Sequence, residues 1–144
     1  MKDNSVIERH IMSVLVDNEP GVLARVIGLF SGRGYNIESL TVSETDPERA
    51  LSRISIVTSG TPMVIEQIKA QLARLVPIHA VRDLTEHDVA IERELALVKI
   101  INHGEDRIEA LRIADTFRAR TLDSTLDSFV SVSYTHLTLP TMAI

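Results

Sequence analysis

Residues 18–37 read NEPGVLARVIGLFSGRGYNI, and this stretch decides the fold because a strand, a tight turn and a helix meet there. The run His10 to Val16 before it alternates in the manner of a strand. Apolar residues from Val22 to Phe30 then recur at helical spacing, with Pro20 and Gly21 at the change of pattern. Because a helix N-terminus attracts carboxylates, the turn is typical of a receptor for a small amino acid rather than of a catalytic centre.

The composition indicates a globular, soluble chain with a sizeable core. The 144 residues are 44% hydrophobic, and their mean hydropathy is +0.11. Aromatic residues are scarce, with no Trp, two Tyr and three Phe, so the core must consist mainly of Val, Ile and Leu. Such residues suit sheets that helices cover on one face. We therefore expect a small layered α+β fold.

Charge and cysteine content exclude several classes of protein. The net charge of −5 and the scattered Lys and Arg residues argue against a nucleic-acid partner, which would need a basic face. The absence of Cys excludes disulfides and thiolate metal sites and fits a reducing cytosol. No apolar run approaches the ~20 residues of a membrane span, and Met1 to Arg9 lacks the apolar core of an export signal. We therefore expect a cytoplasmic protein without a membrane segment.

The first half of the chain alternates strand and helix patterns in the order βαββαβ. Their expected ranges are strand 10–16, helix 20–33, strands 37–43 and 51–58, helix 62–75 and strand 78–84. Turn signals lie between them: Gly32 and Gly34 end the first helix, residues 45–48 turn the central hairpin, and Thr61 caps the second helix with Pro62 in its first turn. With right-handed crossovers, this order predicts a ferredoxin-like sandwich over residues 8–84.

The second half begins the same order of elements again. A polar break at residues 85–88 precedes a strand pattern over 89–101, a helix over 106–117 and two short strands, 120–122 and 128–130. This βαββ order lacks a second helix and a closing strand. We therefore expect a second ferredoxin-like unit over residues 85–130 that is incomplete and exposes apolar sheet surface.

The last fourteen residues differ from the rest of the chain. Residues 131–144 contain no charged side chain and are rich in Ser, Thr and Leu. The run VSYTHLTLPT within them resembles the translation of a sequencing-library transposon adapter joined to a truncated gene. We therefore interpret residues 131–144 as non-native sequence; the alternative is a divergent C-terminal strand. Neither interpretation gives the segment a functional role.

The residues around the opening stretch also resemble a known family. Residues 13–40, SVLVDNEPGVLARVIGLFSGRGYNIESL, are similar without gaps to the start of the small regulatory subunit of acetolactate synthase, also called acetohydroxyacid synthase. The similarity continues through LSRI at 51–54 and ERELALVKI at 92–100, and it covers roughly residues 8–130. The resemblance implies an N-terminal ACT domain that binds branched-chain amino acids at a homodimer interface, followed by a C-terminal domain of related fold.

The same resemblance implies a regulatory role without chemistry in this chain. Members of the family raise the activity of a thiamine-diphosphate-dependent catalytic subunit and confer feedback inhibition by valine. The expected partners are therefore that catalytic subunit, a second copy of this chain, and valine or a related branched-chain amino acid. Thiamine diphosphate, Mg²⁺ and FAD are expected only in the catalytic subunit, and no catalytic residue or metal ligand is assigned here.

Five residues are the candidate ligand contacts. Backbone N–H groups near Gly21 and Val22 suit a carboxylate, and the missing side chain at Gly21 allows close approach. The neutral amides of Asn18 and Asn36 offer both donors and acceptors to a zwitterion. The resemblance implies that Asn36 and Ile37 meet a ligand held by Asn18 and Gly21 of the other subunit, with Ile37 as a wall for an isopropyl group. Each pair would then be half of a site.

Simpler interpretations of these residues stay open. Asn18 can be an ordinary turn amide, and Asn36 after Gly34 can be a left-handed turn residue. His103 with its acidic neighbours is best interpreted as a solvated helix-capping loop rather than a metal site. Two other functional classes also stay open: a free-standing amino-acid-sensing module that acts on another enzyme or regulator, and a small enzyme on the same scaffold, for which no nucleophile, metal cluster or phosphate loop is evident.

Overall fold

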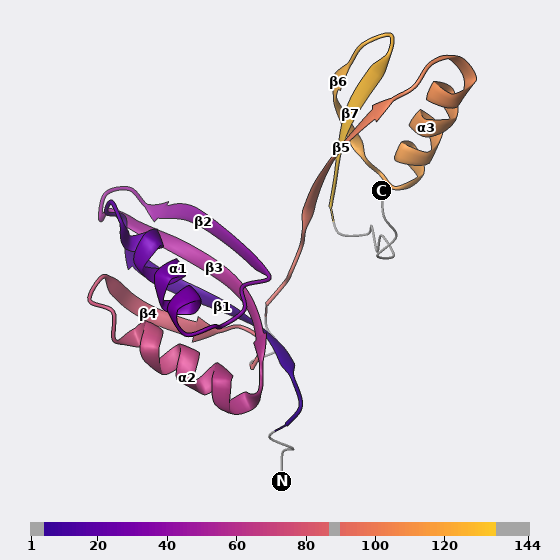
Figure 1. Ribbon diagram of the computed structural model, residues 1–144. Coiled ribbons are helices and arrows are strands. Elements are labelled where there is room, and N and C mark those ends of the chain that lie inside the picture. The colour runs from indigo at the N-terminus through magenta and orange to yellow at the C-terminus, as the bar shows by residue number, and fades with distance from the viewer. Residues whose placement is uncertain (1–4, 87–89, 135–144) are drawn as a thin grey trace. The chain divides into compact units, whose positions relative to one another are not determined.

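The computed structural model describes residues 5–86 and 90–134 (Figure 1). The chain divides into two compact units, Met1–Ala90 and Ile91–Ile144. This division falls a few residues after position 84, where the sequence pattern placed the end of the first domain. Each unit has its own sheet, and each is an α+β arrangement.

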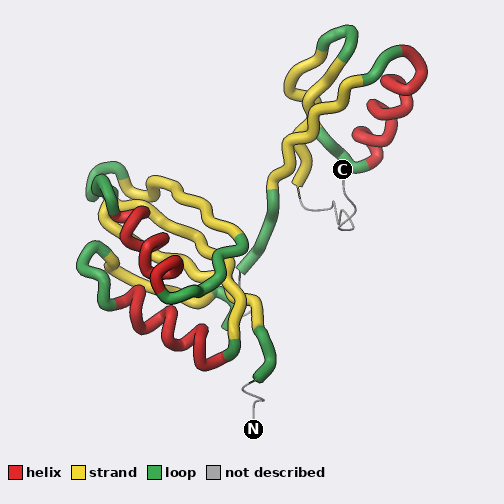
Figure 2. Tube along the Cα trace, viewed as in Figure 1, coloured by secondary structure: helices red, strands yellow, loops and turns green. Residues whose placement is uncertain are grey.

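The first unit has the predicted βαββαβ order. Its elements are β1 (Glu8–Asp17), α1 (Val22–Gly32), β2 (Ser39–Asp46), β3 (Leu51–Gly60), α2 (Pro62–Ala73) and β4 (Ile78–Asp83). The four strands form an antiparallel sheet in the order β2-β3-β1-β4, and both helices cover the same face of it (Figure 2). This is the predicted ferredoxin-like sandwich, with β2 and β4 as its edges.

Alternation along the central strands builds the core. Met12, Val14 and Val16 of β1 are buried, whereas the residues between them are only partly buried on the uncovered face. The helices contribute residues at helical spacing on the sheet-facing side, namely Val22, Val26 and Phe30 of α1 and Ile65, Ile68 and Leu72 of α2. Each such side chain contributes roughly 1.5–3 kcal/mol on burial, so this one apolar layer stabilises the unit.

The two helices begin in different ways. Helix α1 starts at Val22 and not at Pro20 as predicted, because Gly21 has a φ of 85° and is left-handed rather than helical. Helix α2 starts at Pro62 as predicted, and the hydroxyl of Thr61 accepts a hydrogen bond from the N–H of Val64 at 3.4 Å. Only the second helix therefore has a side-chain cap, and the start of α1 depends on its glycine.

The second unit repeats the first three strands and the first helix. It consists of β5 (Leu95–Ile101), α3 (Gly104–Thr116), β6 (Arg120–Ser124) and β7 (Ser128–Tyr134). The sheet order β5-β7-β6 matches the order β1-β3-β2 of the first unit. Within residues 90–134, nothing pairs with β5 on the side where β4 pairs with β1. The predicted incomplete βαββ unit is therefore what these residues form.

The apolar residues of the second unit are largely exposed. Phe129 is its one fully buried large side chain among the described residues, whereas Leu97 of β5 is 63% exposed and Ile108 of α3 is 60% exposed. This agrees with the expectation of uncovered sheet surface.

Within the described part of the chain, no helix is long and apolar enough to cross a membrane.

Three strand limits in the second unit differ from the prediction, and the smallest difference is at β6, which ends at Ser124 and not at 122. Strand β5 begins at Leu95, so the strand pattern at 90–94 is not realised, and residues 87–89 lie outside the described part. Strand β7 continues past Val130 to Tyr134, with Ser131 opposite Val98 and Tyr134 opposite Leu95. Backbone pairing needs no particular side chain. The non-native origin of residues 131–144 thus stays a prediction, and residues 135–144 lie outside the described part.

Candidate functional site

The turn between β1 and α1 exposes backbone at a glycine. The N–H of Asn18 donates to Ala50 O at 2.7 Å, and the N–H of Glu19 donates to Asp17 O at 3.0 Å, so the turn is held to the end of the sheet. An added Cβ at Gly21 would meet no heavy atom within 4 Å. A small ligand can therefore approach the main chain there without displacing protein atoms.

The helix start offers unpaired N–H groups, though not the predicted set. The first helical hydrogen bond runs from Arg25 N–H to Gly21 O at 3.0 Å, whereas the N–H of Val22 makes a long contact of 3.4 Å with Glu19 O. In the described part of the chain, no hydrogen bond is made by the N–H of Gly21 or Leu23. These two N–H groups are therefore available to a ligand, and the side chain of Val22 belongs to the core.

The side chain of Asn18 lies beside carboxylates. Its Nδ2 donates to Glu44 Oε1 of β2 at 3.4 Å, which is a weak bond. The neighbouring Asp17 accepts a hydrogen bond from Nε2 of His79 on β4. The loop from Asp17 to Gly21 therefore carries both acceptor oxygens and N–H donors.

Asn36 and Ile37 lie just before β2. The carbonyl of Asn36 accepts a hydrogen bond from the buried hydroxyl of Thr58, and its Nδ2 donates to Ser59 Oγ at 3.4 Å. The left-handed backbone is at Gly34, with a φ of 68°, and not at Asn36, so the interpretation of Asn36 as a left-handed turn residue is wrong. Ile37 is half-buried against the core and leaves part of its side chain on the surface.

The structure does not bring these two groups of residues together within one chain. Asn18 follows Asp17, which pairs with Leu51 at one end of the sheet, whereas Asn36 contacts Ser59 at the other end. Helix α1 connects the two ends, and its 11 residues span about 16 Å at 1.5 Å per residue. Within one chain, these two groups of candidate residues are therefore separate, and the shared site between two copies stays a prediction.

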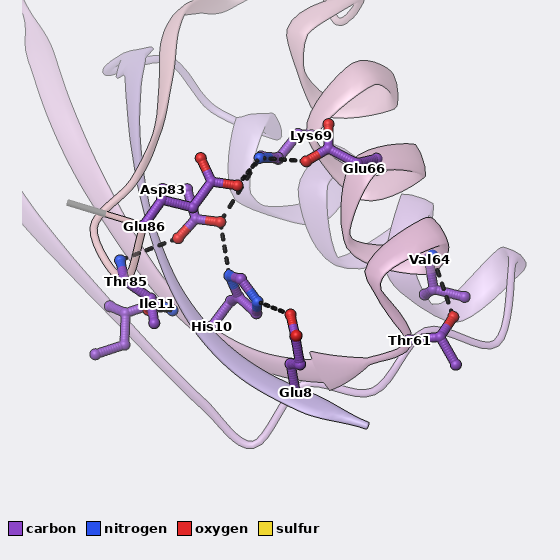
Figure 3. Close-up of polar contacts among 10 residues, drawn as sticks. All are labelled: Glu8, His10, Ile11, Thr61, Val64, Glu66, Lys69, Asp83, Thr85 and Glu86. Carbon is purple, nitrogen blue, oxygen red and sulfur yellow. Dashed lines mark hydrogen bonds and ion pairs between the residues drawn. The ribbon is translucent and has the colours of Figure 1, made fainter. Parts of the chain in front are cut away.

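A buried polar cluster escaped the sequence analysis (Figure 3). His10 faces the helices from β1 and is 7% exposed. Its Nδ1 lies 2.7 Å from Asp83 Oδ2, and its Nε2 lies 2.9 Å from Glu8 Oε2. Burial disfavours the charged ring, but the hydrogen bonds and negative charges of Glu8 and Asp83 outweigh burial and raise the pKa of His10 above 6.5. The available signal was the place of His10 at the start of the inward-facing row that Met12 and Val14 continue.

Lys69 of α2 extends this cluster. Its Nζ lies 2.7 Å from carboxylate oxygens of both Glu66 and Glu86, and 3.7 Å from Asp83 Oδ2. Burial disfavours its charge, but the hydrogen bonds to Glu66 and Glu86 raise the pKa of Lys69 well above its ordinary value. A protein cation therefore occupies the centre of these carboxylates.

His103 of the second unit forms a surface ion pair. Nδ1 of His103 lies 3.0 Å from Asp127 Oδ1, and both side chains are more than 70% exposed. Ser124 accepts a hydrogen bond from Arg107 rather than pairing with a histidine. Among the residues that the structure describes, no group of three or more His, Asp and Glu side chains is arranged to hold a metal ion.

Comparison with known proteins agrees with this fold. Residues 12–80 match the family model described as the AHAS small subunit-like ACT domain, and residues 93–134 match the model of the small subunit of acetolactate synthase. Over 122 residues, the chain is 47% identical to a probable acetolactate synthase small subunit of Archaeoglobus fulgidus, covering 85% of this chain and 75% of the relative. The chain belongs to the acetolactate synthase small-subunit family.

Other members of the small-subunit family agree. The isozyme 3 small subunit of Escherichia coli is 50% identical over 117 residues, which is 81% of this chain and 71% of that protein. The crystal structure of the acetolactate synthase small subunit from Thermotoga maritima has a TM-score of 0.79 and 35% identity, and it covers 88% of this chain and 78% of that chain. The expected family and the ACT-type fold are thereby confirmed.

Proposed function

We propose that this chain is a non-catalytic regulatory subunit that activates the catalytic subunit of acetolactate synthase and makes it sensitive to valine. Family membership carries this proposal, and the exposed glycine turn supplies a plausible receptor for the effector. Thiamine diphosphate, Mg²⁺ and FAD would be held by the catalytic subunit. The described residues of this chain would bind the amino acid and transmit its effect.

The effector site combines two copies of the chain. The N–H groups of Gly21 and Leu23 bind the carboxylate, with the helix dipole adding about 0.3–1 kcal/mol. Asn18, with Glu44 behind it, accepts from the ammonium group. Asn36 and Ile37 of a second copy close the site, and Ile37 contacts the branched side chain.

The free edge of β2 suits the pairing of two copies. In the order β2-β3-β1-β4, β2 has a partner on one side only among the described residues, and Val42 on it is 47% exposed. Pairing two such edges antiparallel satisfies their backbone groups. It also brings the Asn18 end of one sheet to the Asn36 end of the other, because antiparallel partners run in opposite directions.

Regulation follows from a difference in affinity. Valine inhibits only if it binds the inhibitory state of the complex more tightly than the active state. A coupling free energy of ~1–3 kcal/mol is ordinary and changes the affinity about 5- to 150-fold. Because the ligand spans two copies, its binding also strengthens their association, which gives the signal a route into the assembly.

Reconstitution with the cognate catalytic subunit tests the function. Formation of acetolactate from pyruvate should rise when this chain is added and should fall again when valine is added. A family member carrying the complete second unit serves as the positive control. If the control works and this chain neither binds nor stimulates the catalytic subunit, the regulatory assignment for this chain is wrong.

Mixed dimers test the composition of the site. Asn18→Ala and Asn36→Ala should each weaken valine binding when alone. A mixed dimer of the two variants keeps one site in which both asparagines are native. Because random exchange in an equimolar mixture makes about half of the dimers mixed, calorimetry of the mixture should find close to a quarter of the wild-type capacity at wild-type affinity. If the mixture forms dimers but binds no better than either variant, the shared site is refuted.

A further inference from the structure

The geometry around His10 requires a bound proton. Both ring nitrogens lie within hydrogen-bond distance of carboxylate oxygens, Asp83 on one side and Glu8 on the other. An ionised carboxylate only accepts hydrogen bonds, and a neutral imidazole carries a hydrogen on one nitrogen only. In the neutral ring, one nitrogen lone pair would therefore face a carboxylate oxygen inside the protein, where such a contact is unfavourable.

The charges facing this ring come from every neighbouring element. Glu8 lies on the same strand, Asp83 on β4, and Lys69 with Glu66 on α2, while Glu86 lies just after β4. On β3, the residue opposite His10 is the uncharged Thr58. Four carboxylates thus surround two cations when His10 is protonated, and loss of its proton leaves Lys69 alone among them.

The same residues hold the chain where it leaves the first unit. The N–H of Thr85 donates to Asp83 Oδ1 at 3.0 Å, and its hydroxyl accepts from the N–H of Ile11 at 2.9 Å. The N–H of Leu84 donates to Ile11 O at 2.8 Å, and Glu86 contacts Lys69. Asp83 therefore joins His10 to residues 84–86, which begin the connection to the second unit (Figure 3).

We propose that His10, Glu8, Asp83 and Lys69 form a proton-dependent clasp that fixes residues 84–86 against the first unit. When His10 carries its second proton, Asp83 is held between the ring and Lys69, and its other oxygen retains the N–H of Thr85. When His10 loses that proton, Glu8 and Asp83 repel each other across a neutral ring, and the attachment of residues 84–86 weakens. The start of the connection is thus more firmly held in acidic than in alkaline solution.

Nuclear magnetic resonance of the full wild-type chain tests this clasp. Side-chain ¹⁵N shifts recorded between about pH 5 and 9 give the titration midpoint of each histidine. His10 should titrate above its ordinary value, because both ring nitrogens face carboxylate oxygens. Amide exchange of Leu84 and Thr85, divided by the intrinsic rate, should then rise with the deprotonation of His10, by about tenfold for each unit of elevation of its pKa.

Two variants and a control complete the test. His10→Gln should make the corrected exchange of Leu84 and Thr85 fast at every pH, and Glu8→Gln should lower the His10 midpoint. His103→Gln, which removes an exposed histidine that also pairs with an aspartate, should change neither quantity. If His10→Gln does not fold, the wild-type titration and Glu8→Gln still decide. The proposal would be overturned by a His10 titration midpoint at or below about 6.5. It would also be overturned if the corrected exchange of Leu84 and Thr85 did not change around that midpoint.

Discussion

Substitution of Gly21 by Asp, compared with Asn, gives the sharpest test of the effector turn. The φ of 85° at Gly21 is unfavourable for side-chain-bearing residues, but Asn and Asp tolerate it best. A Cβ at this position meets no neighbour within 4 Å, so neither substitution causes a clash. The two variants have the same shape and share the same backbone strain. Their difference therefore isolates one negative charge beside the proposed carboxylate site.

The size of that difference can be worked out from Coulomb's law. Two unit charges ~5 Å apart repel each other by about 1–3 kcal/mol at an effective dielectric constant of ~20–60. This corresponds to a loss of valine affinity of about 5- to 150-fold for Gly21→Asp relative to Gly21→Asn. Because the charge is close to the surface, added salt should reduce the difference.

Isothermal titration calorimetry of both variants with valine measures the effect. Circular dichroism and the dimer fraction at the same concentrations serve as controls, since a site shared between two copies is lost if dimers dissociate. Equal affinities of the Asp and Asn variants, with both folded and dimeric, would refute the placement of the ligand carboxylate at the start of α1. In the reconstituted complex, that refuting result would appear as equal inhibition by valine for the Asp and Asn variants.

Three further predictions concern stability. Thr61→Ala removes the hydrogen bond to Val64 N–H and should lower the free energy of unfolding by about 1 kcal/mol in urea denaturation. Ile68→Val in the core should cost about 0.5–1.5 kcal/mol, whereas Ile108→Val, 60% exposed, should cost clearly less; equal costs would contradict the core assignment. Because the folded pKa of His10 is raised, its stabilisation is complete below about pH 6.5 and should be lost as the pH rises through the folded pKa, a dependence absent from His10→Gln.

Much of the first unit could be predicted because its local signals agree. The strand pattern up to Val16, the turn signals at residues 45–48 and the cap at Thr61 all favour the βαββαβ order, and the structure has it. The errors lie at element ends, where local pattern is weakest. Helix α1 starts two residues later than predicted because Gly21 takes a left-handed conformation. Glycine permits this conformation, but the sequence does not require it.

The candidate site could be predicted only in part from the sequence. Gly21 and Asn18 were identified from a turn that is local in sequence, so their neighbourhood could be anticipated. The long contact of Val22 N–H with Glu19 O depends on the backbone of the turn, which the pattern does not specify. The His10 cluster was missed, since His10 and Asp83 are 73 positions apart, and no local pattern connects residues at that distance.

The sequence by itself determined the order of elements, the family and the glycine turn, because periodicity, turn chemistry and motif spacing are properties of neighbouring residues. Only the tertiary structure decided where those elements meet. Antiparallel pairing of β1 with β3 places the Asn18 and Asn36 ends at opposite ends of one sheet, so the two parts of the motif do not meet within one chain. Sheet packing also buries His10 beside Asp83, which contacts Lys69. The interactions among these charges are stronger there than in water, and the sequence does not show them because the residues are far apart in it.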